Sequence, residues 1–283
     1  LGGVTRENAD EALALGFGGV MMLGDAWKEQ PLPVVLSIAG SDPSAGAVIQ
    51  QDLKTMTLCG AYGATVITAL TSQNTTGVHG VMPVPAETVE SQLRSLFADL
   101  RANAVKIGMI PNKEVAEAVV RVLKEEKRKR ILPVVCDPIL LSTSGTRLMS
   151  EDCVAYVAEE FFPLCTLVTP NLPEHEYLVS RGFPIPTNCL LKGGHAEGEE
   201  MTDVLFLPDE NRSVSYRQER IDSPNLHGTG CALSSAVASY LAQGLSLEPA
   251  VGRAKQWVTQ AILGGKELHI GHGNGPLWYN PNN

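Results

Sequence analysis

The sequence predicts an α/β protein in which a mostly parallel central sheet lies between two layers of helices. From Pro33 onward, short and almost uninterrupted apolar runs alternate with amphipathic segments. Strands that are apolar on both faces are typical of a parallel sheet that helices cover on both sides. The chain has 283 residues, which suits one large domain of this kind. We therefore expect a three-layer α/β/α sandwich.

Apolar and β-branched runs, bounded by glycine, proline or polar residues, predict six core strands. Two more polar runs follow them and predict a hairpin. The core strands are expected over residues 34–40, 64–70, 104–109, 132–137, 166–170 and 189–194, and the hairpin strands over 202–207 and 213–218.

Between these runs, apolar residues recur at helical spacing, and glycines follow several of the segments. The alternation of strand and helix suits a parallel sheet, because each parallel connection has to cross back along the sheet. The helices are expected over residues 47–60, 84–100, 113–127, 151–160, 172–179, 229–242 and 246–268.

The balance of residue types excludes several classes of protein. The formal charge of −9 argues against a nucleic-acid-binding protein. No apolar run reaches about 18 residues and no secretory leader begins the chain, so we expect no membrane span and a cytoplasmic location. The six cysteines form no CxxC pair, so we expect reduced thiols and no structural zinc.

Polar and glycine residues gather where the predicted core strands end. The strands are followed in turn by GSD, TSQN, GM, DP, TPN and KGGH. Ligands of open α/β sheets bind outside the carboxyl ends of the strands, so these residues predict a binding edge. The sequence has no P-loop, no GxGxxG after the first strand, no HExxH and no GxSxG. The enzyme classes that these motifs define are therefore excluded.

The stretch HGTGC, residues 227–231, lies where the helix over 229–242 begins. Glycines let backbone amides converge there, and the positive end of the helix dipole favours an anion. A thiol in this position is biased toward the thiolate, so Cys231 is a candidate reactive cysteine. The alternative is a tight turn before a buried helix that carries a core cysteine.

In their order along the chain, these motifs resemble the hydroxymethylpyrimidine/phosphomethylpyrimidine kinases of thiamine biosynthesis, in the ribokinase superfamily. The segments that carry the resemblance lie between Pro33 and Trp278: IAGSDPSAGAVIQQDLKT, GAYGATVITALTSQNT, KIGM, TPNLPE, LLKGGH, HGTGCALSSAVAS and GHGNGP. The resemblance implies a ribokinase-like fold and a homodimer. It also implies ATP- and Mg²⁺-dependent phosphorylation of 4-amino-5-hydroxymethyl-2-methylpyrimidine, and then of its monophosphate to the diphosphate.

The resemblance also implies which residues transfer the phosphoryl group. The backbone amides of Gly228, Thr229 and Gly230 would hold that group, and Cys231 would face the attacking hydroxyl as a base. Lys192 would supply the cation that neutralises the phosphates.

Three further positions match residues that serve ATP and the metal ion in this superfamily. Asp137, Asn171 and Glu174 would organise Mg²⁺ through water, because that ion keeps several of its waters. Asn171 and Glu174 also fit a capping box at the start of a helix, and both interpretations can hold together.

Five positions match the pyrimidine-binding residues of the family. Gln73 offers an amide donor and acceptor for the edge of the aminopyrimidine ring, whereas its alternative is a loop amide bonded to backbone. Asp52 would line the pocket, or would only suit the helix dipole. Gly40 would let the ring approach the backbone, and Met109 and Ile139 would be apolar walls that otherwise belong to the core.

The chain departs from the family in two places. Ala45 and Val48 replace glycines in one loop and tighten the substrate side, and only the short connection over 180–188 stands where the family usually carries a further helix. Related sugar and pyridoxal kinases usually carry Asp in place of Cys231, so this cysteine, with Gln73 and Met109, favours the pyrimidine enzyme. Two alternatives stay open: a pyridoxal/pyridoxine kinase of the same fold, and a catalytically silent pyrimidine- or nucleotide-binding protein.

The first 27 residues differ from the rest and resemble the end of a thiamine phosphate synthase barrel. A complete barrel of that kind needs about 200 residues or more, so this piece would be a remnant of a synthase to which the kinase is, or was, fused. We therefore expect a remnant plus linker over 1–30 and a kinase domain over 31–283.

Overall fold

The computed structural model describes residues 32–140, 148–193 and 200–279. From Pro33 onward the described residues belong to one compact unit. The predicted remnant over the first 27 residues lies outside the described residues. In the part of the chain that is described, no helix is both long and apolar enough to cross a membrane.

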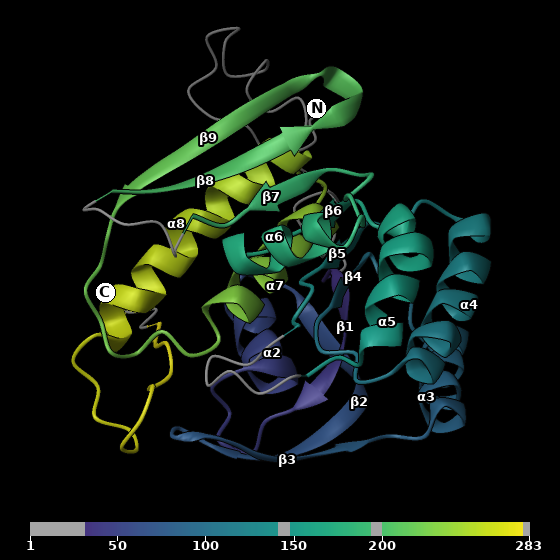
Figure 1. Ribbon diagram of the computed structural model, residues 1–283, viewed down its shortest axis with the longest axis horizontal. Helices are drawn as coiled ribbons and strands as arrows, with labels where there is room; N and C mark the ends of the chain where they lie inside the picture. Colours follow the sequence, from purple (N-terminus) through teal and green to yellow (C-terminus); the bar gives the residue numbers. More distant parts are fainter. Residues whose placement is uncertain (1–31, 141–147, 194–199, 280–283) are drawn as a thin grey trace, which may run out of the picture. The chain divides into compact units, whose positions relative to one another are not determined.

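The described strands form one sheet in the order β3-β2-β1-β4-β5-β6-β7-β8-β9 (Figure 1). Pairing is parallel from β2 through β7 and antiparallel at both edges, where β3 joins β2 and β8 joins both β7 and β9. The strands are β1 (Val34–Ser41), β2 (Tyr62–Asn74), β3 (Gly77–Pro83), β4 (Ala104–Ile107), β5 (Val134–Cys136), β6 (Leu167–Val168), β7 (Cys189–Leu191), β8 (Glu200–Leu207) and β9 (Arg212–Glu219).

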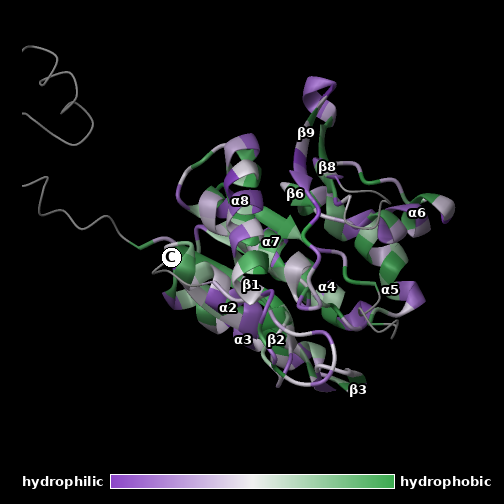
Figure 2. Cartoon of the chain, turned by 90° about the vertical axis from the view of Figure 1, so that its left-hand side faces the viewer, coloured by the Kyte–Doolittle hydropathy of each residue, from purple (hydrophilic) through white to green (hydrophobic). Residues whose placement is uncertain are grey.

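Helices cover both faces of the sheet, so the predicted sandwich is confirmed. Leu36 and Ile38 of β1 point into one core with α3, α4, α5 and α6, whereas Val35 points into the opposite core with α2, α7 and α8. Figure 2 shows hydrophobic and hydrophilic bands on these helices, as expected for helices with one buried side. Their bounds are α2 (Val48–Leu58), α3 (Ala86–Asp99), α4 (Lys113–Lys129), α5 (Glu151–Tyr156), α6 (Leu172–Ser180), α7 (Thr229–Ala242) and α8 (Leu247–Gly265).

The second strand differs from its prediction. It runs to Asn74 and turns directly into β3, which the sequence analysis did not predict, so Gln73 lies in a strand rather than in a loop. The exposure of side chains alternates along residues 70–76. Such a polar edge hairpin lacks the apolar run by which the core strands are recognised.

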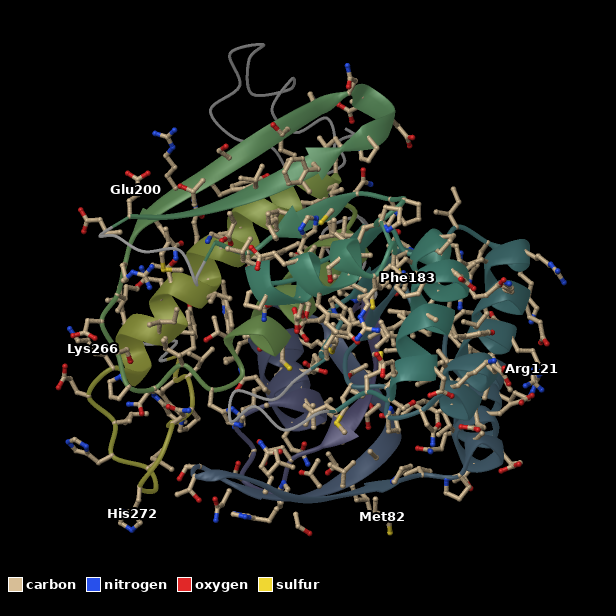
Figure 3. All side chains as sticks on the ribbon, viewed as in Figure 1. Met82, Arg121, Phe183, Glu200, Lys266 and His272 are labelled. Carbon is tan, nitrogen blue, oxygen red and sulfur yellow. The ribbon has the colours of Figure 1, made fainter. Side chains whose placement is uncertain are left out.

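The segment that follows α8 packs beside this hairpin. The Thr75 hydroxyl accepts hydrogen bonds from the backbone amides of His272 and Gly273, at 3.2 and 3.3 Å. Met82 of β3 and His272 accordingly lie along the same edge of the molecule (Figure 3). The late GHGNGP motif therefore supports the edge of the sheet on which Gln73 lies.

Candidate active site

Glycines at the start of α7 let neighbouring groups come close to its backbone. Gly228 precedes the helix with a left-handed backbone at φ +82°, and the Gly46 carbonyl occupies the space that its side chain would need. A Cβ on Gly230 would lie 2.9 Å from an Asp137 carboxylate oxygen and 3.2 Å from the Lys192 nitrogen. The absence of a side chain thus lets a carboxylate and an ammonium group reach the positive end of the helix.

Asp137 and Lys192 form an ion pair beside that helix start. The distance from Lys192 Nζ to Asp137 Oδ1 is 2.7 Å, and the Thr169 hydroxyl donates to the same oxygen at 3.1 Å. Burial alone would lower the pKa of Lys192, but the carboxylates of Asp137 and Glu174 raise it above its ordinary value. Lys192 is therefore a permanent cation, as its predicted role requires.

Glu174 and Asn171 form the capping box that begins α6. Glu174 Oε2 accepts from the Asn171 amide at 2.9 Å, and Asn171 Oδ1 accepts from the Glu174 amide at 2.8 Å. Burial raises the pKa of Glu174 to about 7, although Lys192 lowers it, and Asp137 adds to the increase. Among the described residues, no group of three or more His, Cys, Asp or Glu could hold a metal ion directly.

Cys231 lies in the first turn of α7 and is 5% exposed. Burial raises the pKa of its thiol to about 11, while the Lys106 ammonium acts in the opposite direction. The expected bias toward thiolate is therefore wrong for the free protein, because desolvation outweighs the positive end of the helix. All six cysteines are free and buried.

Asp52 belongs to a buried ion pair. Its carboxylate and the Lys106 ammonium are both 0% exposed and lie 2.7 Å apart. The hydroxyls of Ser37 and Ser235 donate to the same carboxylate at 2.6 and 2.8 Å. Burial alone would lower the pKa of Lys106, but Asp52 raises it. Asp52 is thus a buried carboxylate surrounded by a cation and two hydroxyl groups, and its place in the pyrimidine pocket stays a prediction.

Three of the predicted substrate residues meet beside Cys231. Met109 and Cys231 belong to one small apolar cluster, and Ile139 packs against it. A Cβ on Gly40 would lie 3.0 Å from the Met109 sulfur, and the register of β1 shifts between Ala39 and Ser41. The backbone at Gly40 is therefore close to this apolar group.

Gln73 contacts a residue that the sequence analysis did not select. Its amide nitrogen is 3.1 Å from His227 Nε2, and the same ring nitrogen is 3.1 Å from Asp42 Oδ2. The hydrogen bonds from His227 and Ser44 hold the pKa of Asp42 at about 2, against the effect of burial. Asp42 could have been selected from the sequence, because it follows the first predicted strand at the predicted binding edge.

A second buried pair holds the strand that carries Lys192. Asp203 accepts from the Gly193 amide at 2.8 Å and from Lys255 Nζ at 2.7 Å. Gly193 follows Lys192 directly, and the Thr202 carbonyl leaves no room for a side chain on it. Nothing in the sequence pattern distinguished Asp203 from the other polar residues of its hairpin.

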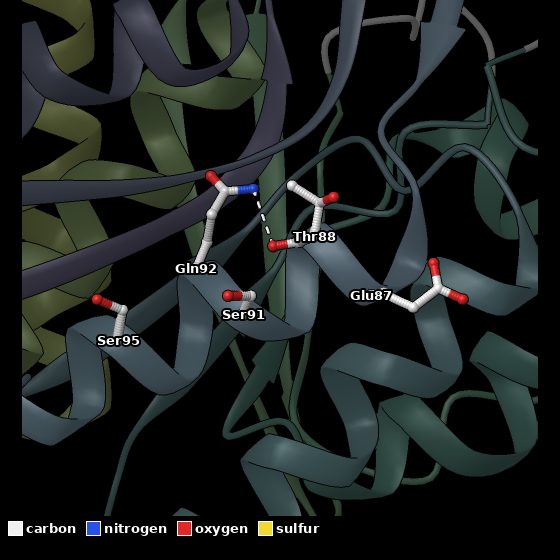
Figure 4. A pocket seen from close by; sticks show the side chains of 5 residues that line it. All are labelled: Glu87, Thr88, Ser91, Gln92 and Ser95. Carbon is white, nitrogen blue, oxygen red and sulfur yellow. Dashed lines mark hydrogen bonds between the residues drawn. The ribbon is translucent and has the colours of Figure 1, made fainter.

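A cavity of about 460 Å³ lies elsewhere, on the surface of α3 (Figure 4). Its lining is Glu87, Thr88, Ser91, Gln92 and Ser95. The Gln92 side chain forms hydrogen bonds with the backbone of Ile67 and Thr88. This cavity brings together none of the predicted site residues.

Taken together, the fold and the charged helix start define a small-molecule kinase of the ribokinase-like class. A family model described as phosphomethylpyrimidine kinase matches residues 42–278. The chain belongs to the phosphomethylpyrimidine kinase family, and the predicted family is confirmed.

Named relatives agree with this family. The hydroxymethylpyrimidine/phosphomethylpyrimidine kinase of Rhizobium meliloti is 42% identical over 260 residues, which cover 86% of this chain and 96% of that protein. A thiamine biosynthesis bifunctional protein of Geobacter sulfurreducens is 38% identical over 307 residues, which cover 96% of this chain. The match spans only 62% of the length of that bifunctional relative.

Solved structures share the fold. A phosphomethylpyrimidine kinase from Clostridium difficile has a TM-score of 0.69 and 35% identity, over 81% of this chain and 99% of that one. A pyridoxal kinase from Bacillus subtilis, solved as an ADP complex, has a TM-score of 0.76 and 29% identity, over 88% and 97%.

Removing the Lys106 charge should destabilise the protein, because Asp52 would remain buried without its cation. For Lys106→Met we expect the free energy of unfolding to fall by about 3–5 kcal/mol in urea titrations. The double variant Lys106→Met/Asp52→Asn, which removes both charges and keeps an acceptor for the serines, should recover most of that loss. A single variant as stable as the wild type would contradict the buried pair.

The raised pKa of Glu174 predicts a pH dependence of stability. A carboxyl group whose pKa is about 7 when folded and 4.5 in its ordinary state stabilises the fold fully below 4.5. That contribution is lost as the pH rises through 7. Relative to Glu174→Gln, the free energy of unfolding of the wild type should fall by about 1–3 kcal/mol between pH 4.5 and 8. Parallel urea titrations of both proteins check this, and a constant difference would refute it.

Proposed function

We propose that this chain phosphorylates the hydroxymethyl group of 4-amino-5-hydroxymethyl-2-methylpyrimidine and then converts the monophosphate to the diphosphate, for thiamine biosynthesis. The observation that carries the proposal is the meeting of three features at one edge of the sheet. The glycine-rich start of α7 faces the pair of Asp137 and Lys192, and Cys231 connects it to the apolar cluster around Met109. Membership of the family supports the substrate.

ATP is the proposed phosphoryl donor. A related pyridoxal kinase was solved with ADP, and another, from Staphylococcus aureus, with AMP-PCP and pyridoxal. The backbone amides at 228–230 would hold the transferred group, and Lys192 would neutralise its charge. In phosphoryl transfer the protein mainly positions its reactants and balances charge, so these fixed groups suit the reaction.

Mg²⁺ fits the oxygen-rich side of this site. Asp137, Glu174 and Asn171 offer carboxylate and amide oxygens, which this ion prefers, and its retained waters suit a site without three converging ligands. When bound, the ion would neutralise charge on the phosphates. Glu174 with a pKa of about 7 would need to lose its proton to take part.

Cys231 has a separate proposed role at the attacking hydroxyl. Its thiol is protonated in the free protein because its pKa is about 11. To act as a base, it has to lose its proton when the substrate and cations assemble around it. The buried Lys106 ammonium favours this loss, because its positive charge lowers the pKa of the thiol.

The second candidate is a pyridoxal kinase, because the TM-score to such a kinase is higher, at 0.76 against 0.69. Sequence identity has the opposite order, with 35% for the phosphomethylpyrimidine kinase against 29%. Backbone likeness across one superfamily reports the common fold, whereas specificity depends on side chains. The pyrimidine is therefore favoured.

A coupled ADP-release assay with hydroxymethylpyrimidine, its monophosphate and pyridoxal side by side tests the proposal. We expect turnover of both pyrimidines and little turnover of pyridoxal. A strong preference for pyridoxal, or no ADP release with any of the three, would overturn it.

We also infer the organisation of the whole chain. The bifunctional relative aligns with 96% of this chain, against 86% for the kinase of Rhizobium meliloti, which supports an origin of residues 1–27 in a fused synthase. The kinase domain over 31–283 would act as a homodimer in the cytoplasm. Sedimentation of the purified chain and of a variant that starts at residue 31 checks the assembly.

The two phosphorylations should respond differently to the loss of Cys231. An alcohol has to lose its proton during attack, so a positioned base helps by about 10²–10⁴-fold. A phosphate monoester has a second pKa of about 6 and is already ionised at neutral pH. Cys231→Ala should therefore slow the first step much more than the second, and Cys231→Asp should restore part of the first.

Steady-state turnover of both substrates measures this difference. Cys153→Ala is the matched control, since Cys153 is a fully buried cysteine in the core on the opposite face of the sheet. It should leave the ratio of the two rates unchanged. If Cys231→Ala slows both steps by one factor, the cysteine shapes the anion site and takes no proton.

A further inference from the structure

Ala45, in the loop before α2, and Val48, the first residue of α2, have a left-handed backbone although neither is glycine. Ala45 has φ +60° and Val48 has φ +46°. A side chain is disfavoured in this conformation, and a β-branched side chain such as that of valine is a clear outlier. Such strain persists only where the surroundings impose it, and it gathers at functional sites.

The loop is held in place on both sides. The Asp42 carboxylate accepts hydrogen bonds from the backbone amides of Gly46 and Ala47, at 3.1 and 3.0 Å. Lys54 Nζ donates to the Ala45 carbonyl at 2.6 Å. These contacts account for the shape of the loop, but a glycine would satisfy them equally well, so they do not explain a valine at position 48.

The Val48 side chain has a specific place. It is 6% exposed and belongs to the apolar cluster that contains Met109 and Cys231, with Ile139 packed against it. The Val48 backbone amide acts as a hydrogen-bond donor that lowers the pKa of the Cys231 thiol, so the backbone of residue 48 lies next to the sulfur. Ala45 is outside this cluster, although its backbone is strained in the same way.

We propose that Val48 is a specificity-determining residue whose isopropyl group narrows the site beside Cys231. Branching at Cβ fixes the isopropyl group close to the backbone, and its burial in the cluster that contains Met109 and Cys231 keeps it out of solvent. A small methylated pyrimidine would fit the remaining space, whereas a ring with more and larger substituents, such as pyridoxal, would be rejected. This inference rests on the proposed function for the identity of the preferred substrate.

The test compares Val48→Gly with Ala45→Gly. Both changes relieve the same kind of backbone strain three positions apart, but only the first removes a side chain from the cluster. For each protein, kcat/KM and the calorimetric Kd are measured for hydroxymethylpyrimidine and for pyridoxal. In Val48→Gly we expect the preference for the pyrimidine to fall about tenfold or more, with an intermediate value for Val48→Ala. In Ala45→Gly the preference should stay within about twofold of the wild type.

An unchanged preference in both Val48 variants, or an equal change in Ala45→Gly, would overturn the inference. Failure of the proposed function has a different signature, because the wild type itself would then turn over neither pyrimidine or would strongly prefer pyridoxal. In that case the ratio of the Kd values for hydroxymethylpyrimidine and pyridoxal, compared between variant and wild type, still tests the role of Val48, because binding is measured without turnover. If Val48→Gly does not fold, Val48→Ala supplies the comparison, and a preference equal to that of the wild type would refute the role.

Discussion

The buried ion pair between Lys106 and Asp52 joins the sheet to the layer of helices that carries the site. Lys106 lies on β4 and Asp52 on α2, while Ser37 of β1 and Ser235 of α7 bind the same carboxylate. Burying two charges costs free energy that replacement by apolar residues would avoid, so such a pair is weak evidence for stability alone. Here it fixes α2 and α7 on the strands, and Cys231 lies one helical turn before Ser235.

A second group of charged side chains lies where α7 begins. Lys192, Asp137 and Glu174 come from three different parts of the chain and meet where α7 begins. The two carboxylates keep Lys192 charged against the effect of burial, whereas burial itself raises the pKa of Glu174 to about 7. Groups that are already oriented need no reorganisation when charge develops during transfer. The second buried pair, Asp203 with Lys255, serves this arrangement because it fixes the backbone next to Lys192.

Periodicity predicted the core of the fold, whereas the site residues came from the family resemblance that the motifs at the strand ends carry. The helix over 229–242 has the predicted bounds, because its apolar residues recur at helical spacing between one glycine, Gly228, and another, Gly244. The strand β3 escaped prediction because an exposed edge strand needs no apolar run. Lys106 had a visible signal, a lysine inside an apolar strand, but its partner depends on the packing of α2 against β4. Burial also keeps the Cys231 thiol protonated, whereas the sequence predicted a bias toward the thiolate.

The substrate side and the phosphate side of the site are connected by contacts of the protein itself. Asp42 of the first loop lies 3.1 Å from His227, and the Gly46 carbonyl fills the space beside Gly228. The nucleophile and the phosphoryl group would therefore be positioned by two loops that already contact each other. Fixing two reactants in one geometry removes much of the entropic part of a barrier, provided that the frame is rigid. A strained loop held by Asp42 is consistent with such a frame, because relaxing it would move both sides of the site at once.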